Sequence, residues 1–109
     1  LARAMEADMG RSVTRLRVDG GASKNRLLME FQGDLLGAIV ERPSCIETTA
    51  LGAAYLAGLG VGLFSDRDAI ARAHHIDWSY KPTMSLDARH AHMVRWERAV
   101  ARARSELRR

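Results

Sequence analysis

The sequence predicts an α/β fold, formed by one domain or by part of one. Segments with the pattern of a strand alternate with segments of helical period, in the order strand, helix, strand, helix, and only helices follow. With 109 residues, of which 47% are hydrophobic, the chain is long enough for one core and too short for two. We therefore expect no second domain in this sequence. Because two strands alone make a poor sheet, we also expect strand partners from a part of the protein outside it.

The first half of the chain carries both predicted strands, and each of its elements ends at a glycine or a proline. The elements are helix 1–9, strand 15–18, helix 23–36 and strand 38–42, and the residues that end them are Gly10, Gly20, Gly37 and Pro43. Glycine suits the left-handed position after a helix, and proline cannot donate a ladder hydrogen bond. In helix 23–36, Leu28, Phe31 and Leu35 share one side, as in an amphipathic helix.

A helix of unusual composition is expected from about residue 48 to residue 59. Thr48 or Thr49 can cap it, because a hydroxyl accepts a hydrogen bond from the free amides of a first turn. Small residues form one stripe of this helix, beside a stripe of bulky residues. The small ones are Ala50, Ala54 and Gly58, and the bulky ones are Leu51, Tyr55 and Leu59. This pattern suits a helix packed closely on a sheet.

The remaining residues are predicted to form two helices joined by an extended segment. Ser65 or Asp66 caps a short helix that ends at about Ala73. Residues 75–85 are interpreted as an extended surface strap, which Trp78 and Tyr80 hold against the body of the protein. Residues 86–107 have helical spacing and form the last helix.

The formal net charge of +4 raises nucleic acid as a class of partner. The arginines are spread along the chain and are dense only at its end, without interleaved aromatic residues on which bases could stack. This dense set consists of Arg95, Arg98, Arg102, Arg104, Arg108 and Arg109. We interpret it as a solvated helix face and expect no nucleic-acid partner.

The location of the protein is predicted from what the sequence contains. Cys45 is the only cysteine, so no disulfide can form within the chain, and no apolar run has the length of a membrane span or the features of a signal peptide. We expect a reducing, cytoplasmic setting and no membrane association. Because Leu1 is not a methionine and already has a helical pattern, we also expect residues upstream of it.

The most informative segment is residues 16–25, LRVDGGASKN. A strand ending at Asp19 is followed by Gly20 and Gly21, which let the backbone approach a bound group, and the helix predicted from Ser23 directs free amides to the same place. This arrangement is typical of a nucleotide or phosphate site at the carboxyl end of a strand. The same residues can also form a tight turn with no ligand. They match neither the GxGxxG nor the GxxxxGKS/T pattern.

No metal site and no catalytic nucleophile are predicted. His90 and His92 are two residues apart, so on a helix they point about 200° apart and cannot hold one ion from the same face. The adjacent His74 and His75 are equally poor ligands, and Cys45 adds no second thiolate. The sequence gives no local support for a Ser-His-acid or Cys-His arrangement.

A block of about half the chain resembles the FGGY family of sugar and polyol kinases, and glycerol kinases in particular. The block is LRVDGGASKNRLLMEFQGDLLGAIVERPSCIETTALGAAYLAGLGVGLF, and its most specific parts are VDGGA at 18–22 and ETTALGAAYLAGL at 47–59. The resemblance implies two actin-like ATPase (ribonuclease H-like) domains with a cleft between them. Residues 1–109 would be the C-terminal, nucleotide-binding part of the second domain.

The resemblance also implies an activity and a set of binding residues. Kinases of this family transfer the γ-phosphoryl group of ATP, with Mg²⁺, to a hydroxyl of glycerol or of a related polyol or sugar. Their Gly-Gly-Ala turn packs against adenosine, and an asparagine one helical turn later lies at the adenine. Carried over, these positions are Gly20, Gly21, Ala22 and Asn25, of which Gly21 and Asn25 are expected to contact the nucleotide directly. Asp19 is expected to shape the turn.

Other parts of the family's machinery do not occur in this sequence. They are the glycine-aspartate-glutamine motif with the general base, the N-terminal phosphate-binding hairpin and the residues that hold glycerol. Smaller departures concern packing and lie at Glu30, Leu63, Phe64 and Met93. We expect the polyol and most of the metal coordination to belong to parts outside this chain, and the chain alone to be inactive.

Two alternatives stay open at the level of sequence. The parent protein can be a kinase of another polyol or sugar, because the residues that select the substrate lie elsewhere. The chain can also be a non-catalytic module that dimerises or binds through an exposed apolar sheet edge, so a homo-oligomer is kept as an alternative.

Overall fold

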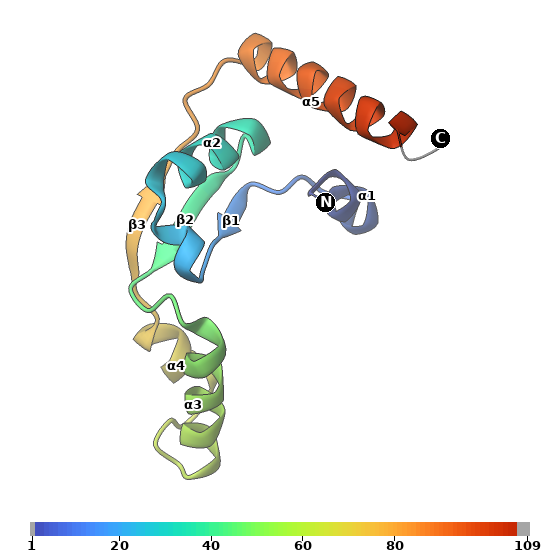
Figure 1. Ribbon diagram of the computed structural model, residues 1–109. Helices are drawn as coiled ribbons and strands as arrows, with labels where there is room; N and C mark the ends of the chain where they lie inside the picture. The colour runs from blue at the N-terminus through green and yellow to red at the C-terminus, as the bar shows by residue number, and fades with distance from the viewer. Residues whose placement is uncertain (1, 107–109) are drawn as a thin grey trace.

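The computed structural model describes residues 2–106, which form a mixed α/β unit with three strands, five α-helices and one short 3₁₀-helix (Figure 1). The elements are α1 (Ala2–Met9), β1 (Arg15–Arg17), the 3₁₀-helix η1 (Gly21–Lys24), α2 (Arg26–Leu36), β2 (Ile39–Pro43), α3 (Thr48–Gly60), α4 (Arg67–Ala73), β3 (Ile76–Tyr80) and α5 (Leu86–Glu106). The predicted α/β class is confirmed. Leu1 and Leu107, at the ends of predicted helices, and Arg108 and Arg109, from the arginine-rich end, lie outside the described residues.

The sheet has the order β1-β2-β3, with β2 in the centre. Strand β1 is parallel to β2, with Leu16 opposite Val40, and β3 is antiparallel to β2, with Tyr80 opposite Val40. The register shifts between Arg42 and Pro43. Because parallel strands end at the same edge of a sheet, the connections that leave β1 and β2 begin side by side.

The third strand corrects the prediction of a surface strap. Residues 76–80 pair with β2 as a full strand, so the sheet receives one of its partners from this chain itself. The physical reason is visible in the sequence, because Ile76, Trp78 and Tyr80 alternate with the polar Asp77 and Ser79, which is the period of a strand. The expected anchoring by aromatic residues is present at Tyr80, whose hydroxyl donates to Asp34 on α2 at 3.1 Å.

The core lies where α2 covers one face of the sheet. Met29, Ala38 and Val40 are buried there, together with Gly33 on the helix. A Cβ atom at Gly33 would lie 2.9 Å from the Val40 side chain and 3.1 Å from the Tyr80 ring. The helix backbone therefore approaches the sheet more closely than any residue with a side chain would permit.

The helix ends follow the predicted glycines, but the starts differ from prediction. Gly10 and Gly37 take the left-handed conformation, with φ of +65° and +67°. Helix α2 begins at Arg26, so the predicted start at Ser23 is wrong, because Gly21–Lys24 forms a separate 3₁₀ turn first. The predicted Asp66 cap is confirmed, since its carboxylate accepts from the amide of Ala69 at 2.8 Å.

The strand β2 ends at the predicted proline, but Pro43 is its last residue and not the first residue after it. The expected cap of the next helix is wrong. The N-cap of α3 is Glu47, which makes no side-chain cap hydrogen bond, and Thr48 is the first helical residue. The Thr48 hydroxyl is not free to cap the helix, because it bonds to the carboxylate of Asp19.

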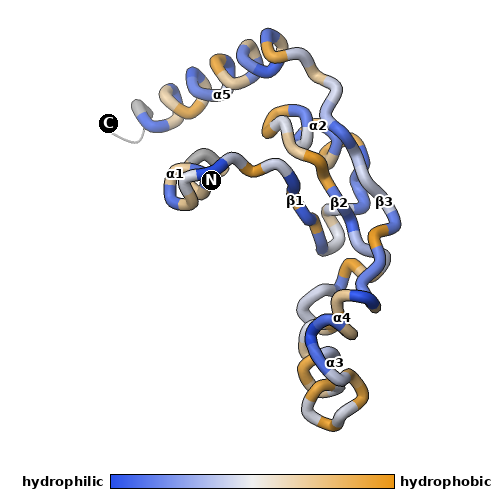
Figure 2. The backbone as a smooth tube through the Cα atoms, turned by 180° about the vertical axis from the view of Figure 1, so that it is seen from behind, coloured by the Kyte–Doolittle hydropathy of each residue, from blue (hydrophilic) through white to orange (hydrophobic). Residues whose placement is uncertain are grey.

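The molecule is elongated, with helices beyond both ends of the sheet (Figure 1). Its radius of gyration is 18.3 Å, whereas a compact domain of this size has a radius of gyration of about 13 Å. Helices α3 and α4 extend from one end, so the prediction that the small-residue stripe packs on the sheet is wrong. Ala50 and Ala54 are exposed, and only Gly58 is buried, against the ring of Phe64. Figure 2 shows hydrophobic stretches along this α3 region.

Within residues 2–106, no helix combines the length and the apolar character needed to cross a membrane.

Candidate functional site

The predicted site residues lie in the connection from β1 to α2, at the edge where β1 and β2 both end (Figure 1). Backbone hydrogen bonds hold this connection against β2 and against the β2–α3 connection. The amide of Val18 donates to Glu41 O at 2.9 Å, and the amide of Gly20 donates to Ile46 O at 2.9 Å. The Thr48 hydroxyl adds a bond to Asp19 from the first turn of α3. Asp19 therefore joins the β1–α2 connection to the first turn of α3.

The outer surface of the turn at Gly20 and Gly21 consists of backbone atoms without covering side chains. Gly20 has φ of +75° and ψ of 176°, a conformation that residues with a Cβ rarely adopt. A Cβ built at Gly20 or Gly21 would meet nothing within 4 Å, and Gly21 and Ala22 are exposed. The turn is therefore open on its outer side, with room for a flat group against the peptide planes.

The inner side of the turn is braced by Ser23, which is 1% exposed. Its hydroxyl donates to Gly20 O at 2.7 Å, and its amide donates to the same oxygen at 3.1 Å. The carbonyl of Ser23 in turn accepts from Nη1 of Arg42, a residue of β2, at 3.2 Å. These three bonds fix the shape of η1 from beneath.

Asn25 has a structural role that the sequence analysis did not assign to it. It is the N-cap of α2, and its Oδ1 accepts from the amide of Leu28 at 3.1 Å. Its side chain is exposed, and within residues 2–106 its Nδ2 group has no hydrogen-bond partner. One end of this amide is therefore used by the helix, while the other remains a donor for a ligand.

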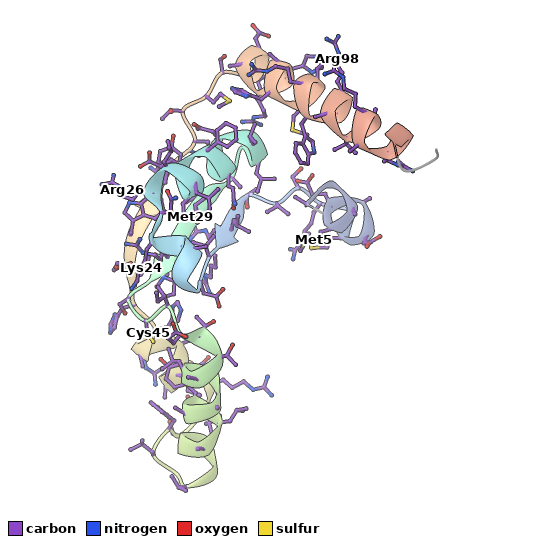
Figure 3. The ribbon with its side chains drawn as sticks, viewed as in Figure 1. Met5, Lys24, Arg26, Met29, Cys45 and Arg98 are labelled. Carbon is purple, nitrogen blue, oxygen red and sulfur yellow. The ribbon has the colours of Figure 1, made fainter. Side chains whose placement is uncertain are left out.

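These features fit the purine end of a nucleotide. A flat ring can lie against the open peptide planes of Gly21 and Ala22, and the Nδ2 donor of Asn25 can bond to a ring nitrogen. Lys24 and Arg26 are exposed beside the turn (Figure 3), and their positive charge favours an anionic ligand. Among residues 2–106, no group of three His, Cys, Asp or Glu side chains is arranged to hold a metal ion.

Gly20, Gly21, Ala22 and Asn25 all lie in the turn between β1 and α2. Sequence reasoning missed the supporting residues Ser23, Arg42 and Thr48. Thr48 is 29 positions from Asp19, and Arg42 is 19 positions from Ser23. A local sequence pattern cannot predict these contacts, because only the parallel pairing of β1 and β2 brings the residues together.

A hollow of about 210 Å³ lies near Cys45. Figure 3 labels this residue where the sheet passes into α3. It is lined by Pro43, Ser44, Cys45, Leu51, Tyr55, Ala73, His74 and His75. The glycine turn contributes no residue to it, so the hollow is separate from the candidate site.

Comparison with known proteins gives matches over nearly all of the chain. The C-terminal domain of the FGGY family of carbohydrate kinases matches residues 1–61, which include the whole turn. Glycerol kinase of Deinococcus radiodurans is 54% identical over 104 residues, and glycerol kinase of Myxococcus xanthus is 50% identical over 103 residues. These matches cover 95% and 94% of this chain, but the chain spans only about one fifth of the length of either relative.

A solved structure shares the fold. The crystal structure of Plasmodium falciparum glycerol kinase with ADP superposes with a TM-score of 0.79 and 32% sequence identity, over 92% of this chain and 20% of that one. The architecture is therefore that of a mixed α/β segment of an actin-like ATPase fold, as the resemblance implied. Within that class, the chain belongs to the FGGY family of carbohydrate kinases.

Proposed function

We propose that this chain is the adenosine-binding part of an ATP-dependent glycerol kinase, which transfers the γ-phosphoryl group of ATP to glycerol and forms glycerol 3-phosphate. Gly20, Gly21, Ala22 and Asn25 are the residues that bind the adenine nucleotide. The observation that carries the proposal is the open glycine turn at the shared carboxyl edge of β1 and β2, with the free Nδ2 donor of Asn25 beside it.

The relatives support glycerol as the acceptor. Glycerol kinases are about half identical to this chain along nearly its whole length, and the solved glycerol kinase with a similar fold was crystallised with ADP. Phosphoryl transfer depends on positioning and charge stabilisation, so a part that holds the adenosine contributes by fixing the nucleotide in place.

We further propose that residues 1–109 are the C-terminal part of the second kinase domain. In this proposal the Mg²⁺ that accompanies ATP is held mainly by residues outside the chain, as are glycerol and the general base. The metal would supply charge neutralisation at the phosphates. The residues of this chain bind and orient the purine, and by themselves they do not transfer the phosphoryl group.

Variants of Asn25 test the proposed site, because its two roles can be separated. Asn25→Asp keeps an oxygen that caps α2 and removes the Nδ2 donor, whereas Asn25→Ala removes both. We expect Asn25→Asp to weaken ADP binding about tenfold, the effect of one lost hydrogen bond plus charge repulsion, while the thermal midpoint is kept. Isothermal titration with ADP and thermal unfolding measure the two effects.

The control for this experiment is Leu27→Ala, which changes an exposed side chain two positions away. Equal ADP affinity of the wild type and Asn25→Asp would contradict the proposed contact. Glycerol-dependent ADP release by this chain alone, in a coupled assay, would contradict its proposed role as a non-catalytic part.

Exposed apolar side chains favour one second candidate, a non-catalytic module that self-associates. Leu56 on α3, and Val61 and Leu63 in the turn that follows it, are 72%, 83% and 76% exposed. Light scattering together with ADP titration separates the candidates. A dimer that ignores ADP supports the module, and a monomer that binds ADP supports the kinase part.

A further inference from the structure

We propose that Arg42 is a positioning residue for the nucleotide-binding turn, and that it makes nucleotide binding depend on the distant strand β3. The inference rests on the proposed function of the turn, and it concerns residues that do not touch the nucleotide themselves.

Arg42 connects the turn to β3 from the central strand. Its side chain is only 17% exposed, and its guanidinium group makes contacts in two directions. Nη1 donates to the carbonyl of Ser23 at 3.2 Å, while Nε and Nη2 donate to the carboxylate of Asp77 at 3.4 Å and 3.5 Å. The guanidinium carbon lies 5.5 Å from the ring centre of Trp78. Asp77 and Trp78 thus fix the position of the Arg42 guanidinium group, which bonds to the carbonyl of Ser23.

The position of the Ser23 carbonyl affects how the proposed nucleotide-binding residues are placed. It lies between Ala22 and Asn25, the exposed residues proposed to contact the nucleotide. The helix η1 has only four residues, and the hydrogen bonds of a 3₁₀ turn have poorer geometry than those of an α-helix, so a bond from outside the turn contributes to its shape. The bond from Arg42 therefore fixes the angle at which η1 meets α2, and with it the position of Asn25 relative to Gly21.

The side-chain type matters for this function. A guanidinium group presents several donors in one rigid plane, so it can bond to Ser23 and Asp77 at the same time. A lysine at position 42 has one nitrogen in place of three, so it can keep the ion pair with Asp77 but does not reproduce the separate donors that contact Ser23 and Asp77. The lysine variant thus separates positioning from a simple charge pair.

The test compares Arg42→Lys, Arg42→Met and Asp77→Asn with Arg26→Met. Arg26 is the matched control, because it is an exposed arginine at the start of α2, paired only with Glu30 at 3.4 Å. ADP affinity is measured by isothermal titration, and amide hydrogen exchange is measured over residues 21–25. Thermal unfolding shows which variants are folded.

We expect Arg42→Met and Arg42→Lys each to weaken ADP binding about tenfold, the usual effect of losing one charged hydrogen bond. Asp77→Asn is expected to weaken it about threefold, although Asp77 lies on β3. Arg26→Met is expected to change the affinity less than about twofold, because exposed ion pairs contribute little. Exchange over residues 21–25 should be faster in both Arg42 variants and unchanged in Arg26→Met.

The outcomes are distinguishable. ADP affinity at the wild-type level in Arg42→Lys, or unchanged exchange over residues 21–25, would overturn the inference. If the wild type itself does not bind ADP, the proposed function fails. In that case hydrogen exchange still decides whether Arg42 positions the turn.

Discussion

Asp34 joins α2 to the segment that follows β3, through a single carboxylate oxygen. Its Oδ1 accepts from the amides of Thr83 and Met84 at 2.7 Å and 3.0 Å, and from the hydroxyl of Tyr80. Burial alone would raise the pKa of Asp34. The hydrogen bonds from Met84, Thr83 and Tyr80, with the nearby charge of Arg89, outweigh it and lower the pKa below its usual 3.8.

The lowered pKa of Asp34 predicts how stability depends on pH. Because the folded-state pKa is below the unfolded value, the stabilisation is complete above the unfolded pKa, and it is lost as the pH falls through the folded pKa. We expect the urea midpoint of the wild type to fall more steeply below about pH 4 than that of Asp34→Asn. Asp68→Asn, an exposed change of the same charge, should follow the wild type. Parallel curves for the wild type and Asp34→Asn would contradict this.

At the scale of the element, two helical glycines have opposite surroundings. Gly33 on α2 is buried against Val40 and Tyr80, whereas a Cβ at Gly52 on α3 would meet nothing within 4 Å. The first glycine is required by the packing of a helix on a sheet. The second only lowers the helix propensity of α3.

Alanine at these two glycines should therefore shift stability in opposite directions. Gly33→Ala is expected to lower the free energy of unfolding by about 1–3 kcal/mol, because α2 must move away from the sheet. Gly52→Ala is expected to raise it by about 0.5–1 kcal/mol, since alanine favours the helix. Urea denaturation measures both values. A stabilised Gly33→Ala variant would show that α2 does not approach the sheet as described.

The sequence predicts most elements of the fold, and its errors have identifiable causes. Glycine positions and apolar periodicity correctly locate β1, β2 and the end of α2. Strand β3 alternates correctly, but Trp78 and Tyr80 are equally compatible with an extended strap, so the sequence alone does not predict its pairing with β2. The sequence predicts too early a start for α2, because a local pattern does not distinguish the 3₁₀ turn of Gly21–Lys24 from the first turn of an α-helix.

The candidate site was predictable only in part, for a different reason. The glycines and Asn25 form a contiguous motif, so their proximity follows from the chain itself. The bonds from Thr48 to Asp19 and from Arg42 to Ser23 join separate segments, and they exist because the strands pair. The double use of the Asn25 amide depends on the true start of α2.

The whole molecule has a small core and much exposed apolar surface. Met29 is 4% exposed and Val40 is fully buried, but large side chains at both ends of the molecule are open, among them Leu56 at 72% and Trp96 at 64%. Stability is therefore concentrated where α2 covers the sheet, and the helices beyond the sheet contribute little to it.

This distribution predicts which apolar substitutions are tolerated. The double variant Leu56→Gln and Leu63→Gln should change the free energy of unfolding by less than about 0.5 kcal/mol, because both side chains are already in water. It should also bind less of a fluorescent hydrophobic dye. Met29→Ala, in the core, is expected to cost about 2–5 kcal/mol. A large loss of stability in the double variant would show that the α3 region packs more tightly than described.

The backbone hydrogen bond from the amide of Ser44 to the carbonyl oxygen of His75, 3.0 Å long, joins the two ends of the segment that contains α3 and α4. In terms of topology, β2 and β3 are the two arms of a hairpin, and residues 45–74 are a long insertion at its tip. Since the ends of this insertion are already fixed to each other, the part of it that follows Thr48 can change in length at small entropic cost without altering the register of the sheet. The bonds of Ile46 and Thr48 to the glycine turn lie before that part and would be kept.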